Sequence, residues 1–190
     1  ACDLFGCQYP VFLAGMGGVS RAELVSAVIN AGGYGFLGMV RERPERIRAE
    51  IKQVRETSNA EFGVNIIPAA TAPDLLQQQV DVCIREQVAS VCLFWDVFPG
   101  IIKQLKEAGI LVIHQVGSVQ DAEAALQAGV HALIVQGVEA GGHVRGSFPL
   151  KQLLSRVLRH AEVPVLAAGA IVDGQDLTDV LMSGADGAVI

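Results

Sequence analysis

The chain has 190 residues, of which 51% are hydrophobic and 18% charged, and its formal net charge at pH 7 is -6. This composition suits a single globular domain with a sizeable core and is too apolar for a disordered chain. The negative charge and the lack of a Lys/Arg cluster argue against a surface for nucleic acid or anionic membranes. The longest apolar run, residues 163–172, is too short to cross a bilayer, and no basic segment followed by an apolar one opens the chain. We therefore expect a cytoplasmic protein.

Short apolar runs alternate with helix-length segments along the whole chain. Eight of these runs predict strands, over residues 10–14, 34–38, 62–66, 90–94, 111–115, 132–136, 164–168 and 187–190. Most of them are continuously apolar, as parallel strands are when both faces of the sheet are covered. Four of the helix-length segments end in a glycine, which closes a helix in the left-handed conformation without a steric clash: Gly32, Gly109, Gly129 and Gly184.

Helix starts are also marked in the sequence. Ser20 and Ser118 are each followed three positions later by an acidic residue, which predicts that their hydroxyls cap helices. Thr71 and Asp173 carry a looser form of the same signal, and Pro44 suits a first helical turn.

Two architectures can hold eight strand–helix units. A doubly wound sheet would show one G-x-G-x-x-G turn after its first strand, and Met16-Gly17-Gly18 does not have that pattern. Glycine-rich turns recur instead after several strands, which favours a barrel whose active site collects loops from the carboxyl ends of its strands. The sequence thus predicts one α/β domain over residues 1–190, a parallel (β/α)₈ TIM barrel.

The most unusual segment, residues 136–146, follows the sixth predicted strand. Two adjacent glycines there allow close approach of a ligand, and the ionisable His143 comes directly after them. A lone histidine is usually structural, but this position favours a functional one. The other histidines have weaker claims: His114 in a strand, His131 before a strand and His160 at a helix end.

The four cysteines form neither a C-x-x-C pair nor a Cys/His metal-binding pattern, so no metal site is predicted: Cys2, Cys7, Cys83 and Cys92. We interpret them as reduced thiols without chemical function, with a reactive thiol as the alternative.

Several segments together resemble the nitronate monooxygenase family, formerly grouped as 2-nitropropane dioxygenases, across essentially the whole chain. The most specific is E-A-G-G-H at residues 139–143. The others are LAGMGGVS at 13–20, AGGYGFLG at 31–38, FGVN at 62–65, HQVGS at 114–118 and AAGAIVDG at 167–174. Members of this family are normally longer, so the resemblance implies a barrel truncated at about the eighth strand, without its last helix and the C-terminal segment that covers the substrate.

The resemblance implies an FMN-binding barrel and assigns roles position by position. It implies contacts with FMN from nine residues: Ala14, Gly15, Met16, Asn65, Gln115, Gln136, Gly141, Gly142 and Gly169. Gly169 would present backbone N–H groups to the phosphate, as barrel loops after the seventh and eighth strands do. The alternatives are structural: Asn65 could cap a turn, Gln115 and Gln136 could bond neighbouring backbone, and Gly169 could simply form a tight turn.

The resemblance also makes His143 the catalytic base. An imidazole can accept a proton near neutral pH, and the α-carbon of a nitroalkane is acidic because the nitro group delocalises the charge. The implied reaction is oxidation of nitronates or nitroalkanes by O₂ to carbonyl compounds and nitrite. Glu139 either orients His143 or serves loop structure, and Arg145 either attracts the anionic substrate or is a solvated surface residue.

Two rival functions stay open at this point. The first is an FMN-dependent, NAD(P)H-using enoyl-[acyl-carrier-protein] reductase or quinone reductase, which shares the barrel and a similar E-A-G-G-H element. The second is a truncated barrel without catalysis. In either enzymatic case the expected partners are small molecules, with neither nucleic acid nor membrane.

Overall fold

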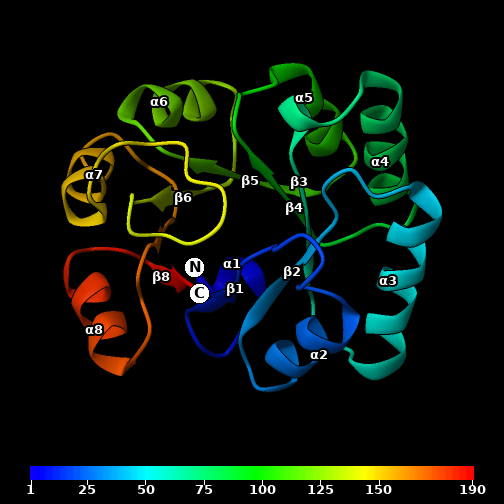
Figure 1. Cartoon of the computed structure of the whole chain (residues 1–190), viewed down its shortest axis with the longest axis horizontal. Coiled ribbons are helices and arrows are strands. Elements are labelled where there is room, and N and C mark those ends of the chain that lie inside the picture. Colours follow the sequence, from blue (N-terminus) through cyan, green and yellow to red (C-terminus); the bar gives the residue numbers. More distant parts are fainter.

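The computed structural model describes all 190 residues as a closed barrel of eight parallel strands surrounded by helices (Figure 1). Each strand pairs with the next in chain order, and β8 closes the barrel on β1. The strands are β1 (Val11–Leu13), β2 (Tyr34–Gly38), β3 (Gly63–Ile66), β4 (Ser90–Phe94), β5 (Leu111–Val116), β6 (Ala132–Gln136), β7 (Val165–Ala168) and β8 (Gly187–Val189). The predicted TIM barrel is confirmed, and each strand end lies within one residue of its predicted position.

A helix connects each strand to the next, and one further short helix precedes β1. The helices are α1 (Cys2–Phe5), α2 (Ala22–Asn30), α3 (Pro44–Thr57), α4 (Pro73–Arg85), α5 (Pro99–Glu107), α6 (Val119–Gln127), α7 (Leu150–Val157) and α8 (Gly174–Met182), with a 3₁₀ turn η1 (Pro68–Ala70) after β3. None of them is both long enough and apolar enough to pass through a bilayer.

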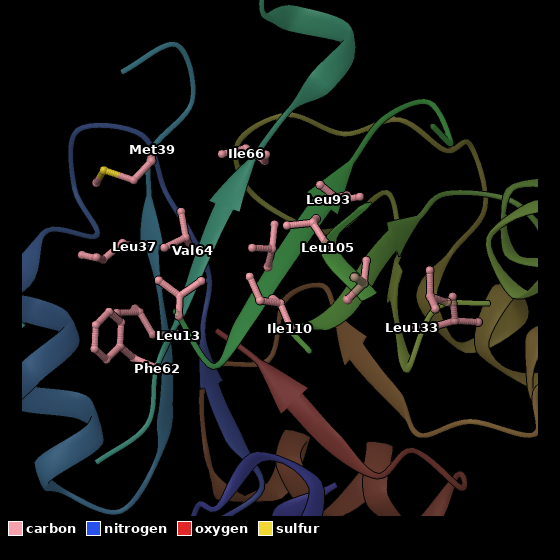
Figure 2. Close-up of a cluster of buried hydrophobic side chains, with 14 of the residues drawn as sticks. Leu13, Leu37, Met39, Phe62, Val64, Ile66, Leu93, Leu105, Ile110 and Leu133 are labelled. Atoms are coloured by element: carbon pink, nitrogen blue, oxygen red, sulfur yellow. The ribbon is translucent and has the colours of Figure 1, made fainter. Parts of the chain in front are cut away.

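Two apolar clusters form the core. The larger fills the space between the barrel and its helices, and Figure 2 shows strand side chains such as Leu37, Val64 and Leu133 among its members. The smaller fills the barrel interior, where Phe12, Tyr34 and other inward side chains meet. Continuously apolar strands are required because both of their faces are buried.

Helix α1, which the sequence reading did not predict, closes the amino end of the barrel. Its Phe5 is only 2% exposed and lies edge-on to Phe12 and to Tyr34, with ring centroids 5.0 Å apart in both pairs. The Tyr34 hydroxyl is hydrogen-bonded to Ser90 Oγ at 2.6 Å, which satisfies both groups in the interior. The amino end is therefore filled, and its buried polar groups satisfy each other.

The predicted helix ends are confirmed, since all four closing glycines have left-handed φ angles between 79° and 98°. Two of the predicted N-caps are also confirmed. Ser118 Oγ accepts from the N–H of Asp121 at 3.0 Å, and the Asp173 carboxylate accepts from the first N–H groups of α8.

The other two predicted N-caps are wrong. Ser20 Oγ donates to the carbonyl of Ala14 at 2.6 Å and so ties the β1–α2 loop back on itself. The N-terminus of α2 is instead satisfied by the buried Glu50 of α3, which accepts from Ala22 N–H at 2.7 Å. Thr71 Oγ1 donates to the carbonyl of Ile67 in the η1 turn. In both cases a carbonyl in a tight loop competes successfully for the hydroxyl.

Candidate active site

The carboxyl end of the barrel gathers the residues that the sequence singles out. Because all eight strands are parallel, each connection that leaves a strand end emerges at this end. Ala14 follows β1, Asn65 and Gln115 lie near the ends of β3 and β5, Gln136 ends β6, and Gly169 follows β7. The structure therefore brings these positions to one mouth.

The β1–α2 loop packs tightly across the ends of β2 and β3. A Cβ atom on Gly15 would overlap the side chain of Asn65, and one on Gly38 would overlap the carbonyl of Met16. Contacts within the chain thus suffice to require glycine at both positions. Met16 itself is partly exposed at the mouth.

Two side-chain amides in the mouth form no hydrogen bond with a nitrogen or oxygen atom of the chain. Asn65 is 6% exposed, yet its amide hydrogen-bonds no nitrogen or oxygen of the chain and keeps some contact with solvent. Its nearby neighbour is the thiol of Cys92: burial raises the pKa of Cys92 to about 12, and Asn65 opposes that rise. The half-buried Gln115 likewise has an unbonded side-chain amide. Buried polar groups are seldom left unpaired, so these amides are available to a ligand.

Gln136 behaves differently, because its amide holds the β6–α7 loop. Nε2 donates to the carbonyl of His143 at 2.9 Å, and Oε1 accepts from the N–H of Arg145 at 3.4 Å. The side chain is 3% exposed. This is the structural alternative raised above, in which Gln136 bonds neighbouring backbone.

Glu139 also has a structural role in this loop. Its carboxylate accepts from the N–H of Leu150, at 2.9 Å from Oε2 and 3.2 Å from Oε1. A negative charge at the N-terminus of α7 is favourable both for the free N–H groups and for the helix dipole. Glu139 therefore caps α7 and does not contact His143 through any hydrogen bond in the structure.

Arg145 ties the same loop to two neighbouring connections. Its guanidinium forms a two-pronged ion pair with Asp121 of α6, at 3.0 and 3.1 Å, and a further one with Asp96 after β4, at 2.9 Å. It also lies over the ring of Trp95, with 5.6 Å from Cζ to the centroid. Arg145 is thus neither a free anion receptor nor a solvated side chain. Sequence reasoning missed both aspartates, because Asp121 lies 24 residues away and was read only as part of a helix start.

His143 stands on this anchored loop with its imidazole unengaged. Its backbone carbonyl is held by Gln136, whereas its exposed ring forms no hydrogen bond with the chain. Gly141 and Gly142 beside it have no atom within 4 Å of their would-be Cβ positions, and Gly142 has a φ of 72°. An exposed base on an anchored loop, next to open space, suits proton abstraction from a bound substrate.

Gly169 and Ala170 form an unusual turn after β7. Their φ angles are 148° and 48°, so glycine is favoured at Gly169 by backbone conformation. The turn directly follows β7, and a Cβ atom on Gly169 would lie 3.5 Å from Ala140 N and 3.6 Å from the side chain of Leu150. It borders an open cavity of about 500 Å³ between α7 and α8, which Glu139 also lines.

His114 is structural. It is fully buried, and burial lowers its pKa in spite of the nearby carbonyl oxygens of Gln115, at 2.9 Å, and Asp96, at 3.3 Å. His131 is half-buried, and its Nδ1 accepts from Val112 N–H at 2.9 Å. Of these three histidines, only His143 is exposed and has a ring that forms no hydrogen bond with the chain.

The Arg145–Asp121 pair predicts a pH-dependent contribution to stability. Desolvation alone would raise the pKa of Asp121, but hydrogen bonds from Arg145 and Ser118 outweigh it and hold that pKa below its usual value of 3.8. We expect Asp121→Asn to lower the free energy of unfolding at pH 7 by about 1–3 kcal/mol, since Arg145 loses a charged partner.

The sign of the pH effect follows from the lowered pKa of Asp121. The contribution of ionised Asp121 to the free energy of unfolding is complete above the pKa of Asp121 in the unfolded chain. It is lost as the pH falls through the lower pKa of Asp121 in the folded protein. Urea unfolding of both proteins at pH 7 and near pH 3 checks this. A difference between the two proteins that persists or grows in acid would contradict the assignment.

Comparison with known proteins bears on the whole chain. The sequence model of the family described as nitronate monooxygenase matches residues 1–190. A Mycobacterium tuberculosis protein named "(3aS,4S,5R,7aS)-5-hydroxy-7a-methyl-1-oxo-octahydro-1H-indene-4-carboxyl-CoA dehydrogenase" is 38% identical, over 99% of this chain and 53% of that protein. A Staphylococcus aureus "Probable nitronate monooxygenase" is 32% identical, over 97% of this chain and 64% of that protein. This chain thus spans about half the length of the first relative.

Solved structures agree with the sequence matches. FabK from Thermotoga maritima superposes with a TM-score of 0.93 and 34% identity, over 99% of this chain and 59% of that one. A nitroalkane oxidase from Streptomyces ansochromogenes has a TM-score of 0.89 and 31% identity, over 100% and 66% of the two chains. The resemblance inferred from the motifs is confirmed: the chain belongs to the nitronate monooxygenase family.

Proposed function

We propose that this chain is the barrel of an FMN-dependent oxidoreductase in which His143 removes a proton from an acidic carbon of the substrate. One observation carries the proposal. Gln136, Glu139 and Arg145 on the same loop are each bonded to other parts of the protein, whereas the His143 imidazole is exposed and forms no hydrogen bond with the chain.

The residues at the mouth fit an FMN molecule. The free amides of Asn65 and Gln115 can bond the polar edge of a flavin ring, and the open surface over Gly141 and Gly142 leaves room for a flat group. The Gly169 turn offers backbone N–H groups suited to a phosphate. When bound, FMN would supply the electron acceptor of the reaction and the means of reducing O₂. Gln136 enters this proposal as a residue that positions the loop.

The substrate that we favour is a nitroalkane or its nitronate. A neutral nitroalkane gives its α-proton to His143, and the resulting nitronate is the species that is oxidised to a carbonyl compound and nitrite. Arg145 is bound by two aspartates, so it does not serve as the anion receptor. The family match and the names of two relatives support this substrate class.

A second candidate is the oxidation of an acyl-CoA thioester. Two relatives with 35% and 38% identity carry the name of a carboxyl-CoA dehydrogenase. His143 would again remove a proton from a carbon atom, because a thioester also acidifies the carbon next to its carbonyl group. The same base on the same loop therefore serves either substrate class.

Absorbance spectroscopy of the FMN-loaded protein separates these functions. Anaerobic bleaching of the flavin spectrum by a nitronate, followed by nitrite release in air, supports the nitronate reaction. Bleaching by an acyl-CoA supports the second candidate. Rapid bleaching by NADH alone favours a reductase, and a protein that never acquires a flavin spectrum with excess FMN is a barrel without this function.

Gly141→Ala tests the cofactor site separately from catalysis. Because no atom lies within 4 Å of the added methyl and the backbone φ is not left-handed, the variant should match the original protein in thermal unfolding. If FMN lies against Gly141, the added methyl group would overlap the cofactor. The dissociation constant of FMN should then rise about tenfold or more. Fluorescence titration with FMN measures this, and unchanged affinity would remove Gly141 from the site.

A further inference from the structure

We propose that Cys2 and Cys7 form a redox-sensitive dithiol that closes to an intramolecular disulfide beneath the amino end of the barrel. The two cysteines lie at the opposite end from the candidate active site: Cys2 is the first residue of the one-turn helix α1, and Cys7 follows its closing glycine, Gly6. The proposal therefore does not rest on the proposed function.

The helix end brings the two cysteines together. Gly6 has a φ of 66°, and the N–H groups of Gly6 and Cys7 both donate to the carbonyl of Cys2, at 2.8 and 3.3 Å. The bond from Cys7 is the outer bond of a Schellman ending, and in that motif the side chains at the two bonded positions, here Cys2 and Cys7, commonly touch. A glycine at position 6 is what permits it.

The backbone distances are compatible with a disulfide. The backbone nitrogen of Cys7 lies 3.3 Å from the carbonyl oxygen of Cys2. The Cα of Cys7 is about 1.5 Å from that nitrogen, and the Cα of Cys2 is about 2.4 Å from that oxygen. The two Cα atoms are therefore at most about 7 Å apart. Disulfides span Cα separations of about 4.4–6.8 Å. Since the connecting bonds are not collinear, the actual separation is smaller than the limit.

The four thiols differ in how accessible they are to solvent. Cys2 and Cys7 are half-buried and free, whereas Cys83 and Cys92 are fully enclosed in the core. Burial and the neighbouring Cys2 together raise the pKa of Cys7 to about 11, as expected for adjacent thiols. Burial raises the pKa of Cys83 to about 12. Because only Cys2 and Cys7 are accessible from solvent, attack on a small-molecule disulfide is confined to the pair at α1.

The reaction with oxidised glutathione balances in two exchanges. The Cys2 thiol loses its proton, and the thiolate attacks the glutathione disulfide, which releases one glutathione thiol and leaves a mixed disulfide on Cys2. The Cys7 thiolate then attacks the Cys2 sulfur, and the second glutathione leaves as a thiol. Two protein thiols are oxidised, one glutathione disulfide is reduced, and the two protons pass to the glutathione products.

The Cys2–Cys7 disulfide would link the first residue of α1 to the residue that follows Gly6 at the end of the helix. Phe5, which fills the amino end of the barrel between Phe12 and Tyr34, sits within the six-residue ring that the disulfide closes. Closing a short ring restricts the open state of the turn. The amide N–H groups of Gly6 and Cys7 should therefore exchange with solvent about tenfold or more slowly in the oxidised protein.

The test treats the protein with oxidised glutathione at pH 8 and follows it by mass spectrometry with peptide mapping. The expected product has lost two hydrogen masses, contains a peptide linking Cys2 to Cys7, and returns to four free thiols with dithiothreitol. Cys7→Ser should stop at one glutathione adduct on Cys2, and Cys83→Ser should close the internal bond normally. Separate glutathione adducts on both cysteines, or no reaction at either, would overturn the proposal.

Discussion

Replacing His143 by Asn should abolish most turnover of neutral nitroalkanes while leaving FMN bound. Asparagine keeps polarity and approximate size but removes the group that accepts the proton. The loss should fall in the ~10²–10⁴-fold range of a missing general base. Because the imidazole ring makes no hydrogen bond with the chain, its removal should not disturb the loop. Steady-state rates of nitrite release on a nitroalkane measure the effect.

The same variant on a preformed nitronate is the internal control. That substrate has already lost its proton, so its oxidation should fall much less. Equal losses on both substrates would mean that His143 positions the substrate or stabilises charge. A fall in FMN content would indicate a structural role, and full activity would end the catalytic assignment.

Replacing Gly146 by Ala should impair both stability and catalysis. An added Cβ would overlap the carbonyl of Gly117, where the β5–α6 and β6–α7 connections meet backbone to backbone. A backbone segment cannot move aside as a flexible side chain can. The substitution should therefore lower the free energy of unfolding by about 1–3 kcal/mol. For a chain of this size that lowers the melting temperature by about 2–12 °C. His143 lies three residues away, and a displacement of about 1 Å costs about 10²-fold in rate.

Gly174→Ala is the matched control. Gly174 begins α8, has no left-handed φ angle, and has no atom within 4 Å of its would-be Cβ. Its melting temperature and activity should equal those of the unchanged protein. If Gly146→Ala melted at the same temperature as Gly174→Ala, the two connections would not pack as described.

The barrel could be predicted because its determinants are local. Continuous apolar runs mark buried parallel strands, and the closing glycines Gly32, Gly109, Gly129 and Gly184 act within one turn of the chain. The carboxyl-end position of Asn65, Gln136 and His143 followed from strand direction alone. Their roles toward a ligand stay predictions.

The contacts that hold the site could not be predicted in the same way. Glu50 caps α2 across 28 residues, and Arg145 pairs with Asp121 across 24. No local periodicity encodes such partners, because they meet only after the barrel closes. Ser20 illustrates the converse, since a sequence signal for capping was overridden by a carbonyl in its own loop.

The closed amino end of the barrel limits the routes by which ligands can reach the candidate site. Phe5 packs edge-on against Phe12 and Tyr34, so apolar side chains fill the barrel at this end. Every molecule that reaches the mouth must therefore enter and leave from the same side. In the proposed function, an organic substrate and O₂ would both approach the site from the carboxyl end.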